Sequence, residues 1–386
     1  MTDSPLTLGI EEEYLLLDAG TGLPSPRATQ VQAMAHLGAE VGVTEVENEL
    51  LQAQVEVATG ICTELGDAAE QLAHFRTAVG DAAARAGCRL AATGAAPFSS
   101  GTTIPVTDKQ RYHEMRENAA VLVDEQLIDG MHIHVAVPDR HAGAAALGRL
   151  RPWLSVMVAL GGNSPYWEGR DTGFASWRTV VFGRWPVSGA PPYTGDAATY
   201  EQRVDALLRT GVIPDRRQLY WHARLSETYP TLEVRAADVQ LDVDSAITLA
   251  GLARALVATG LRQTIDGAPP LDPPSSVLHA AGWHAARHGL TGNLVDPLSG
   301  SPARAADVVA ALLDHVTPAL REYGDEQRVH DGLVRLLDAN TGAERQRRAR
   351  EEGGTAALLD LIAPTATAPP PTAAPAGDDE AGRVPA

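Results

Sequence analysis

A short apolar segment near the N-terminus carries three consecutive carboxylates, Glu11, Glu12 and Glu13. The segment is typical of a β-strand over residues 6–17, so Glu11 and Glu13 should share one face and Glu12 the other. Two carboxylates on a half-buried face require a compensating positive charge. A divalent cation such as Mg²⁺ or Mn²⁺ would supply it, because both bind carboxylate oxygens. The alternative is an edge strand with a solvated acidic face.

A second acidic segment follows. Residues 50–58 alternate in polarity and predict a strand with Gln52, Gln54 and Glu56 on one face. Glu49 has the opposite parity, so it can reach the same site as Glu56 only if a bend or bulge lies between them. Without such a bend, Glu49 belongs to an acidic turn that leads into the strand.

A pair of histidines lies on the next polar strand. His132 and His134 follow a turn at residues 129–130 and should share one face of a strand over 131–137. Such a pair is a common metal-ligand arrangement, although one buried and one exposed histidine would give the same pattern. If only one of them is a ligand, the site is mostly oxygen, which favours Mg²⁺ over Zn²⁺.

Two arginines complete the set of chemically capable residues. Glu233 and Arg235 share one face of a strand expected over residues 231–239. They form either a simple surface ion pair or a metal-binding carboxylate beside a phosphate-binding guanidinium. Arg178 lies in a long segment over 161–196, rich in glycine, proline and tryptophan, where it could bind a substrate carboxylate through two hydrogen bonds.

The remaining pattern predicts an α+β fold with an antiparallel sheet, since strands and helices do not alternate strictly. Thr107 and Gln110 are spaced as a capping box, and Pro152 should interrupt the helix that contains it. From residue 363 onward the composition falls to proline, alanine, threonine and glycine, which predicts a disordered tail over 363–386. Helices are expected over 64–86, 107–127, 142–160, 245–264, 278–288, 303–320, 326–339 and 342–351, and further strands over 90–93 and 218–224.

Composition narrows the function classes. The net charge of −18 argues against nucleic-acid or anionic-membrane binding. The sequence has neither a phosphate-binding loop ending in Lys-Ser or Lys-Thr nor a dinucleotide-binding glycine motif. It shows no signal peptide and no stretch of about 18 uncharged apolar residues, so we expect a cytoplasmic protein. Cys62 and Cys88 are expected to be buried, reduced thiols. A homodimer is the commonest state for a soluble enzyme.

These segments together resemble the ATP-dependent carboxylate-amine ligases, also called glutamate–cysteine ligase type 2. The similarity occurs in the family's order and covers roughly residues 6–362, which predicts a single catalytic domain over 1–362. The matching segments begin at Leu8-Gly-Ile-Glu-Glu-Glu-Tyr14, Gln54-Val-Glu-Val-Ala58, Gly130-Met-His-Ile-His134, Asn163-Ser-Pro-Tyr-Trp167, Asp171-Thr-Gly-Phe174, Glu233-Val-Arg235 with Asp238, Trp283-His-Ala-Ala-Arg287 and Thr341-Gly-Ala-Glu344.

The resemblance implies a glutamine-synthetase-like catalytic fold, in which an antiparallel sheet forms an open funnel with helices packed outside. ATP and Mg²⁺ or Mn²⁺ would lie on the inner face of the sheet. Arg235 would face the nucleotide phosphates or the acyl phosphate, with Glu13 and Glu233 beside the nucleotide, and Arg178 would contact a substrate carboxylate. The implied metal ligands are Glu11, Glu13, Glu49, Glu56, His132 and Glu233, whereas His134 has no clear metal role.

The implied reaction joins a carboxylate to an amine. ATP would phosphorylate the γ-carboxylate of glutamate, and the amine, cysteine in the family's named reaction, would attack the acyl phosphate. Small-molecule substrates are therefore the expected partners. The same chemistry on another acid or amine is the first alternative. A metal-dependent hydrolase using His132 and His134 and a non-catalytic binding protein with the same fold are the other two.

Overall fold

A seven-stranded antiparallel sheet forms the centre of the computed structural model, which describes residues 6–35, 46–338 and 341–364. The strand order is β10-β11-β5-β1-β3-β2, and β4 also pairs with β1. The sheet is not closed into a barrel, which agrees with the expected open, antiparallel α+β architecture. Its strands are β1 (Leu8–Asp18), β2 (Glu47–Asn48), β3 (Gln54–Ala58), β4 (Cys88–Ala91), β5 (Gly130–Ala136), β10 (Ala223–Leu225) and β11 (Thr231–Asp238).

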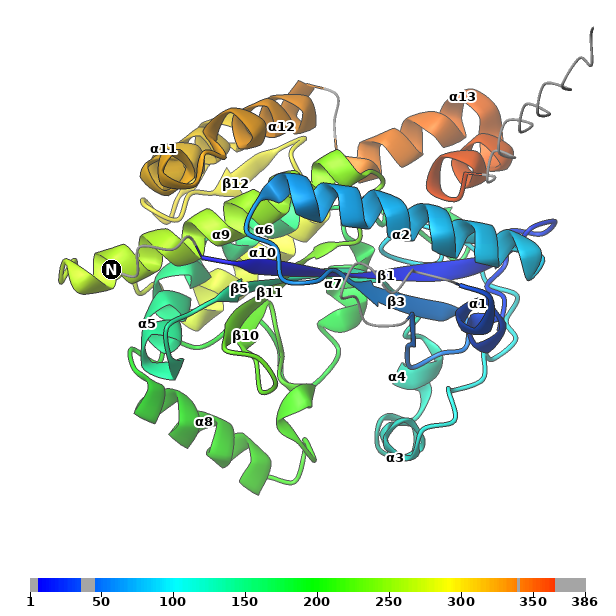
Figure 1. The fold of residues 1–386 in the computed structure, drawn as a ribbon, viewed down its shortest axis with the longest axis horizontal. Coiled ribbons are helices and arrows are strands. Elements are labelled where there is room, and N and C mark those ends of the chain that lie inside the picture. The colour runs from blue at the N-terminus through cyan, green and yellow to red at the C-terminus, as the bar shows by residue number, and fades with distance from the viewer. Residues whose placement is uncertain (1–5, 36–45, 339–340, 365–386) are drawn as a thin grey trace, which may run out of the picture.

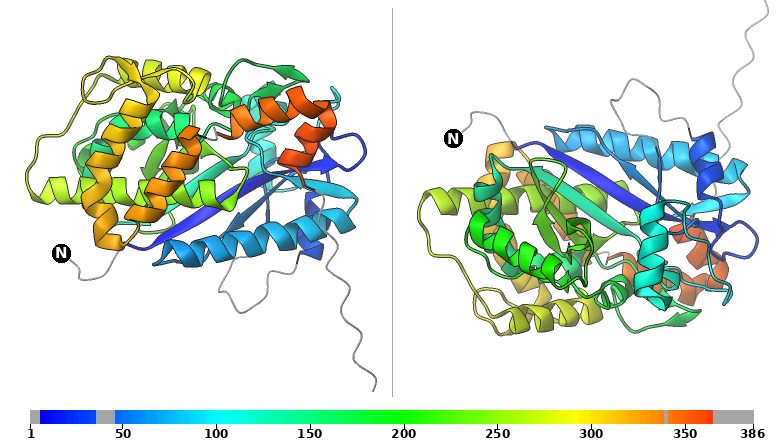
Figure 2. Two further views of the ribbon diagram at one scale, coloured as in Figure 1. Left: turned by 90° about the horizontal axis from the view of Figure 1, so that it is seen from above. Right: turned by 90° about the horizontal axis from the view of Figure 1, so that it is seen from below.

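Helices flank both faces of this sheet (Figures 1 and 2). In Figure 1 the sheet is seen nearly edge-on, with α2, α9 and α11 to α13 above it and α3, α4 and α8 below. Short pairings join β6 (Tyr166–Trp167) to β7 (Arg170–Asp171), β8 (Ser188–Gly189) to β9 (Tyr220–Trp221) and β12 (Asn293–Val295) to β13 (Pro302–Arg304). The helices are α1 (Ala28–Met34), α2 (Leu65–Arg85), α3 (Gln110–Ala119), α4 (Val121–Asp124), α5 (Arg140–Leu150), α6 (Leu154–Leu160), α7 (Trp177–Phe182), α8 (Ala197–Arg209), α9 (Val243–Ile265), α10 (Ser275–His288), α11 (Ala305–Tyr323), α12 (Glu326–Asp338) and α13 (Gly342–Ile362).

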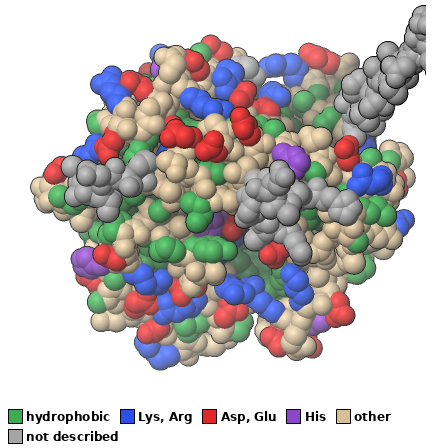
Figure 3. Space-filling view, viewed as in Figure 1, with side chains coloured by type: hydrophobic (Ala, Val, Ile, Leu, Met, Phe, Trp, Pro, Cys, Tyr) green, Lys and Arg blue, Asp and Glu red, His purple; other side chains and the backbone are tan. Residues whose placement is uncertain are grey.

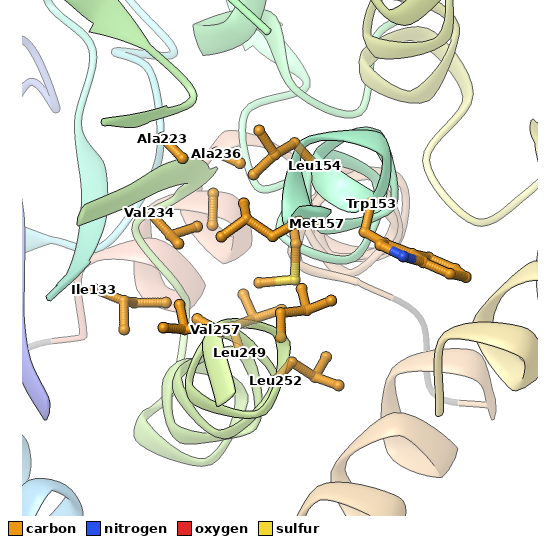
Figure 4. Close-up of a cluster of buried hydrophobic side chains, with 14 of the residues drawn as sticks. Ile133, Trp153, Leu154, Met157, Ala223, Val234, Ala236, Leu249, Leu252 and Val257 are labelled. Atoms are coloured by element: carbon orange, nitrogen blue, oxygen red, sulfur yellow. The ribbon is translucent and has the colours of Figure 1, made fainter. Parts of the chain in front are cut away.

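The main hydrophobic core lies between the sheet and helices α6 and α9. Figure 4 shows Ile133 and Val234 of the sheet facing Met157 of α6 and Leu249 and Val257 of α9. Among the described residues, α9 is the one helix long and apolar enough to cross a membrane, although no such stretch was expected from the sequence. Because 83% of its apolar window is buried inside the protein, its apolarity is explained by its place in the core.

The sheet face toward α2 contains Glu12, the middle one of the three consecutive carboxylates. Glu12 is fully buried there, as the alternation of β1 predicted. The guanidinium of Arg76 in α2 donates to it from Nε at 3.0 Å and from Nη2 at 2.5 Å, and the Tyr14 hydroxyl donates as well. The carboxylate therefore has its own cation on this face and is not available to the opposite one.

Three sequence predictions in the first third of the chain were wrong in whole or in part. The helix expected over 107–127 is interrupted at Ala120, whose φ of 50° is not helical, so it forms α3 and α4 instead. The capping box is absent because the helix begins after Lys109, and the Thr107 hydroxyl instead donates to the Glu49 carbonyl at 2.5 Å and accepts from the Gln52 side-chain amide at 2.9 Å. The strand expected over 50–58 begins only at Gln54, since residues 51–53 form a turn.

The later elements also differ in their limits. The helix around Pro152 is interrupted by a 3₁₀ turn over Arg151–Trp153, as expected. The segment 161–196 contains α7 and short strands. The helix α8 after it was not predicted, although its buried residues Tyr200 and Val204 have helical spacing. The strand expected over 218–224 is split into β9 and β10, and α13 continues ten residues or so beyond 351, with non-helical backbone at two adjacent glycines. The predicted tail lies outside the described residues from 365 onward, and the single domain over 1–362 stays a prediction.

The Glu12–Arg76 pair gives a test of the sheet's packing. Arg76→Met should lower the free energy of unfolding by about 3–5 kcal/mol, because it leaves a buried carboxylate without its cation. The double variant Glu12→Met/Arg76→Met should recover most of that loss, because it removes both charges and keeps similar volumes. Urea unfolding followed by circular dichroism measures both. A loss below about 1 kcal/mol in the single variant would show that the pair is not needed.

Candidate active site

A cavity of about 250 Å³ lies on the sheet face away from α2 and α9. Its floor consists of side chains of β1, β3, β5 and β11, and its walls come from α3, α7 and the loop over residues 226–229. The space-filling view in Figure 3 shows a hollow on the side below the sheet, with lysine or arginine side chains along its margin. All the residues with predicted chemistry line this cavity, namely Glu11, Glu13, Glu49, Glu56, His132, His134, Arg178, Glu233 and Arg235.

The acidic residues form two groups on the cavity floor. Glu11, His134 and Glu233 make one group, and Glu13, Glu49 and Glu56 make the other. Within each group, one possible ligand atom per residue lies within 4.8 Å of the others. Strand pairing produces this arrangement, because β1 lies between β5 and β3 and places its alternate carboxylates opposite their residues.

A hairpin turn brings Glu49 to the site. Residues 51–53 reverse the chain, so β2 pairs antiparallel with β3, and the amide N of Glu49 donates to the carbonyl O of Gln54 at 3.4 Å. Glu49 thereby reaches the same face as Glu56, which lies directly opposite Glu13 in the register of β1 and β3. The bend that the parity of Glu49 required is present as a full turn.

Both histidines lie against the carboxylates. His132 places Nδ1 3.1 Å from Oε2 of Glu11 and Nε2 3.6 Å from Oε1 of Glu13, so it lies between the two groups. His134 places Nε2 3.2 Å from Oε1 of Glu11 and Nδ1 2.9 Å from the Thr231 hydroxyl. Nε2 of His132 is buried and has no hydrogen-bond partner, whereas Nε2 of His134 has only the ion-pair contact with Glu11. Buried imidazole nitrogens beside carboxylate oxygens are a suitable donor set for a divalent cation.

Arginines surround Glu233 at the other end of the floor. Arg235 contacts Glu233 through Nη1, which also lies 3.3 Å from Nδ1 of His132. Arg224 of β10 donates to the same carboxylate from Nε at 2.8 Å and from Nη2 at 3.2 Å. Arg224 was not predicted as a site residue, because it reaches the site only through the pairing of β10 with β11, which puts it opposite Glu233.

A register shift in β11 determines where Arg235 lies. The pairing of β11 with β5 shifts between Val234 and Ala237, so Arg235 falls within an irregularity of the ladder. Such bulges commonly redirect a side chain beside an active site. Here the amide N of Arg235 donates to the carbonyl O of His222, at 2.7 Å.

Arg178 lies in the wall above Glu13. Its guanidinium is buried, stacks over the Phe182 ring at 5.2 Å and lies 3.4 Å from the carbonyl O of Arg235. It also packs on Gly130, whose amide N donates to Oε2 of Glu13 at 2.6 Å. Arg178 is therefore close to one carboxylate group without an ion pair of its own in the described part of the chain.

The two carboxylate groups differ in electrostatics. Burial alone would raise the pKa values of Glu11 and Glu233, but His132 and His134 outweigh it for Glu11, and Arg235 and Arg224 for Glu233, so both pKa values are lowered. Burial and the charge of Glu13 raise the pKa of Glu49 to about 7. Burial and neighbouring carboxylates, Glu11 first, also raise the pKa of Glu56. The first group is thus neutralised by protein cations, whereas the second lacks enough positive charge.

Most of the chain matches one protein family. The model of glutamate-cysteine ligase family 2 matches residues 7–360. The chain belongs to this family. Membership identifies it as an ATP-dependent carboxylate-amine ligase, the enzyme class that the motifs indicated. A relative from Mycobacterium sp. (strain KMS), provisionally named glutamate–cysteine ligase 2-2, is 42% identical over 359 residues, which is 92% of this chain and 97% of the relative.

Solved structures show the same fold at low sequence identity. A glutamate–cysteine ligase from Francisella tularensis, in complex with AMP, superimposes with a TM-score of 0.68 at 12% identity, over 93% of this chain and 88% of that one. A bifunctional glutathione synthetase from Pasteurella multocida gives a TM-score of 0.66 at 14% identity, over 92% of this chain and 51% of that one. The predicted ligase fold is therefore confirmed.

Gly130 offers a test of the contact between Arg178 and the floor. A Cβ at this position would lie 2.2 Å from Nη2 of Arg178, so Gly130→Ala must displace the guanidinium. We expect a loss of about 1–3 kcal/mol in the free energy of unfolding and a lower rate of ADP formation. As a control, Gly80→Ala in α2 has no atom within 4 Å and should stabilise the protein by about 0.5–1 kcal/mol. Unchanged stability and rate in Gly130→Ala would contradict the close contact.

Proposed function

We propose that this cavity activates the γ-carboxylate of glutamate with ATP and joins it to an amine, of which cysteine is the first to test. The observation that supports this most directly is the charge pattern of one sheet face. Three carboxylates lack enough cations of their own, beside a second group that is flanked by arginines. A triphosphate with bound Mg²⁺ would bring metal cations to the carboxylates and phosphate anions to the arginines.

We propose divalent metal binding at both carboxylate groups. Glu13, Glu49 and Glu56 would hold one ion, and Glu11 with Glu233 and an imidazole would hold another. Both histidines are candidates for that imidazole. His132 was the expected ligand, and its Nε2 has no hydrogen-bond partner. His134 is the histidine whose ring nitrogen lies close to both Glu11 and Glu233. The bound ions would supply Lewis-acid charge that offsets repulsion between the substrate carboxylate and the γ-phosphate.

The protein's cations have separate roles in this proposal. Arg235 points from the bulge of β11 toward the cavity and would contact the transferred phosphoryl group, where it stabilises developing negative charge. Arg224 holds Glu233 from the other side and fixes that carboxylate in place. Arg178, buried in the wall without an ion pair there, would bind the α-carboxylate of the acid substrate. Glu13 and Glu233 would lie beside the nucleotide through their metal ions.

The proposal requires no nucleophile from the protein, because the amine attacks the acyl phosphate and releases phosphate directly. A metal-dependent hydrolase built on the same imidazoles would act without ATP, so a nucleotide requirement separates the two. We expect small-molecule substrates, no nucleic-acid or membrane partner and a cytoplasmic location, which the free, buried Cys62 and Cys88 support. The homodimer stays an expectation.

Product analysis tests the proposed reaction. With ATP and Mg²⁺, ADP release should require glutamate and one amine together, and the product mass should equal both reactants minus one water. Glu13→Gln and Glu233→Gln should abolish turnover without unfolding the protein, because each removes a proposed metal ligand. Glu117→Gln, which changes one exposed carboxylate on α3, is the matched control and should keep full activity. Hydrolysis of a single reactant without ADP formation would favour the hydrolase.

Metal binding should depend on pH in a defined direction. The Glu49 carboxyl, with a pKa of about 7, must lose its proton before it can bind an ion. The affinity for Mn²⁺ should therefore rise between about pH 6 and pH 8, as calorimetry or electron paramagnetic resonance would measure. Glu49→Gln should weaken binding and flatten this dependence, whereas Glu117→Gln should change neither. An affinity that falls as the pH rises would contradict the assignment.

A further inference from the structure

Asp238 is a buried carboxylate at the end of β11 that the proposed reaction does not use. It is 1% exposed and accepts three hydrogen bonds. The amide N of Asn163 donates to Oδ2 at 2.8 Å, the Ser164 hydroxyl donates to the same oxygen at 2.6 Å, and the Ser176 hydroxyl donates to Oδ1 at 2.7 Å. Neither oxygen faces the cavity, so Asp238 acts on protein groups.

The two serines form the start of α7. Ser176 is the N-cap of this helix, and its hydroxyl oxygen accepts from the amide N of Thr179 at 3.2 Å. The Ser164 hydroxyl oxygen accepts from the amide N of Arg178 at 3.0 Å. Each hydroxyl thus donates to Asp238 and accepts from the first turn of α7, so one carboxylate fixes both oxygens that hold the helix start.

The first turn of α7 carries Arg178, whose side chain lines the cavity. Arg178 reaches the cavity wall from this turn, and its guanidinium has little freedom because Gly130 leaves no room behind it. Asp238 is equally confined, since a Cβ on Gly94 would lie 2.5 Å from its Cγ. Five residues before Asp238, the same strand carries Glu233. A small shift at Asp238 would therefore move Arg178 relative to the carboxylate floor.

We propose that Asp238 is a positioning residue for substrate binding: through Ser164 and Ser176 it fixes the start of α7, and so the place of the Arg178 guanidinium, relative to the strand that carries Glu233 and Arg235. The proposal rests on the proposed role of Arg178 in binding the acid substrate. A carboxylate suits this position because it offers acceptors on both oxygens, whereas an amide must present a donor to one of the two sides.

The test is Asp238→Asn, with steady-state kinetics for each substrate varied separately. We expect the KM for the acid substrate to rise about 10-fold or more, because displaced positioning groups are costly, while the KM for ATP changes less than about 2-fold. Ser176→Ala removes one of the two links and keeps the carboxylate, so it should shift the same KM in the same direction. It serves as the second variant if Asp238→Asn does not fold.

Gln346→Met is the matched control. Gln346 is fully buried and donates to Asn163, on the same loop, but it has no hydrogen bond to the serines or to α7. It should lower stability without a selective rise in the KM for the acid. An equal, selective rise in this control would overturn the proposal, because it would show that any buried polar change near the loop has the same effect.

Two further measurements separate this proposal from the assignment of Arg178. When Asp238→Asn is added to the Arg178→Lys variant, the KM for the acid should rise by less than about 2-fold relative to Arg178→Lys alone, because both changes act through one group. Effects that multiply would overturn the proposal. Hydrogen exchange of the peptide covering residues 176–183 should increase in Asp238→Asn, whether or not Arg178 binds substrate. Unchanged exchange there would also overturn it. An unchanged KM in Arg178→Lys alone would contradict the substrate-binding role of Arg178, on which the proposal rests, and would leave only the link between Asp238 and the start of α7.

Discussion

Repulsion between carboxylates on one sheet face is the constraint on which this site depends. Glu13, Glu49 and Glu56 converge there, and burial together with the charges of neighbouring carboxylates raises the pKa values of Glu49 and Glu56. Protonation of Glu49 and Glu56 reduces the repulsion in the free protein, and a bound cation would offset it when the enzyme works. The rest of the fold holds these residues together. Strand β1 lies between β3 and β5, a hairpin turn places Glu49 beside Glu56, and α2 and α9 cover the opposite face of the sheet.

The alternation of β1 made much of this predictable. Period-two alternation assigns Glu11 and Glu13 to the cavity and Glu12 to the helices, and Arg76 neutralises Glu12 there. The same rule placed His132 and His134 together. Family motifs supplied the open antiparallel fold and the enzyme class, which the structure and the family match confirm. Helices with a clear apolar stripe, such as α2, were located within a residue or two.

Several features of the site depend on strand pairing and on turns, which the pattern of a single segment does not show. Arg224 reaches Glu233 only through strand pairing, and Thr107 bonds to the Glu49 carbonyl where sequence spacing suggested a helix cap. The sequence position of Glu49 predicted a bend between Glu49 and Glu56, but it did not show where that bend lies. His134 shares a group with Glu11 because of the register between β1, β5 and β11, which a single strand pattern does not contain.

The central claim is that this face transfers a phosphoryl group from ATP to a carboxylate. Positional oxygen labelling tests it most directly. Glutamate with ¹⁸O in its γ-carboxylate is incubated with ATP, Mg²⁺ and the amine, and the released phosphate is analysed by mass spectrometry. An acyl phosphate predicts one ¹⁸O atom in each phosphate, because the carboxylate oxygen that attacks leaves with the phosphoryl group. Phosphate without label, formed in step with the amide product, would contradict the account.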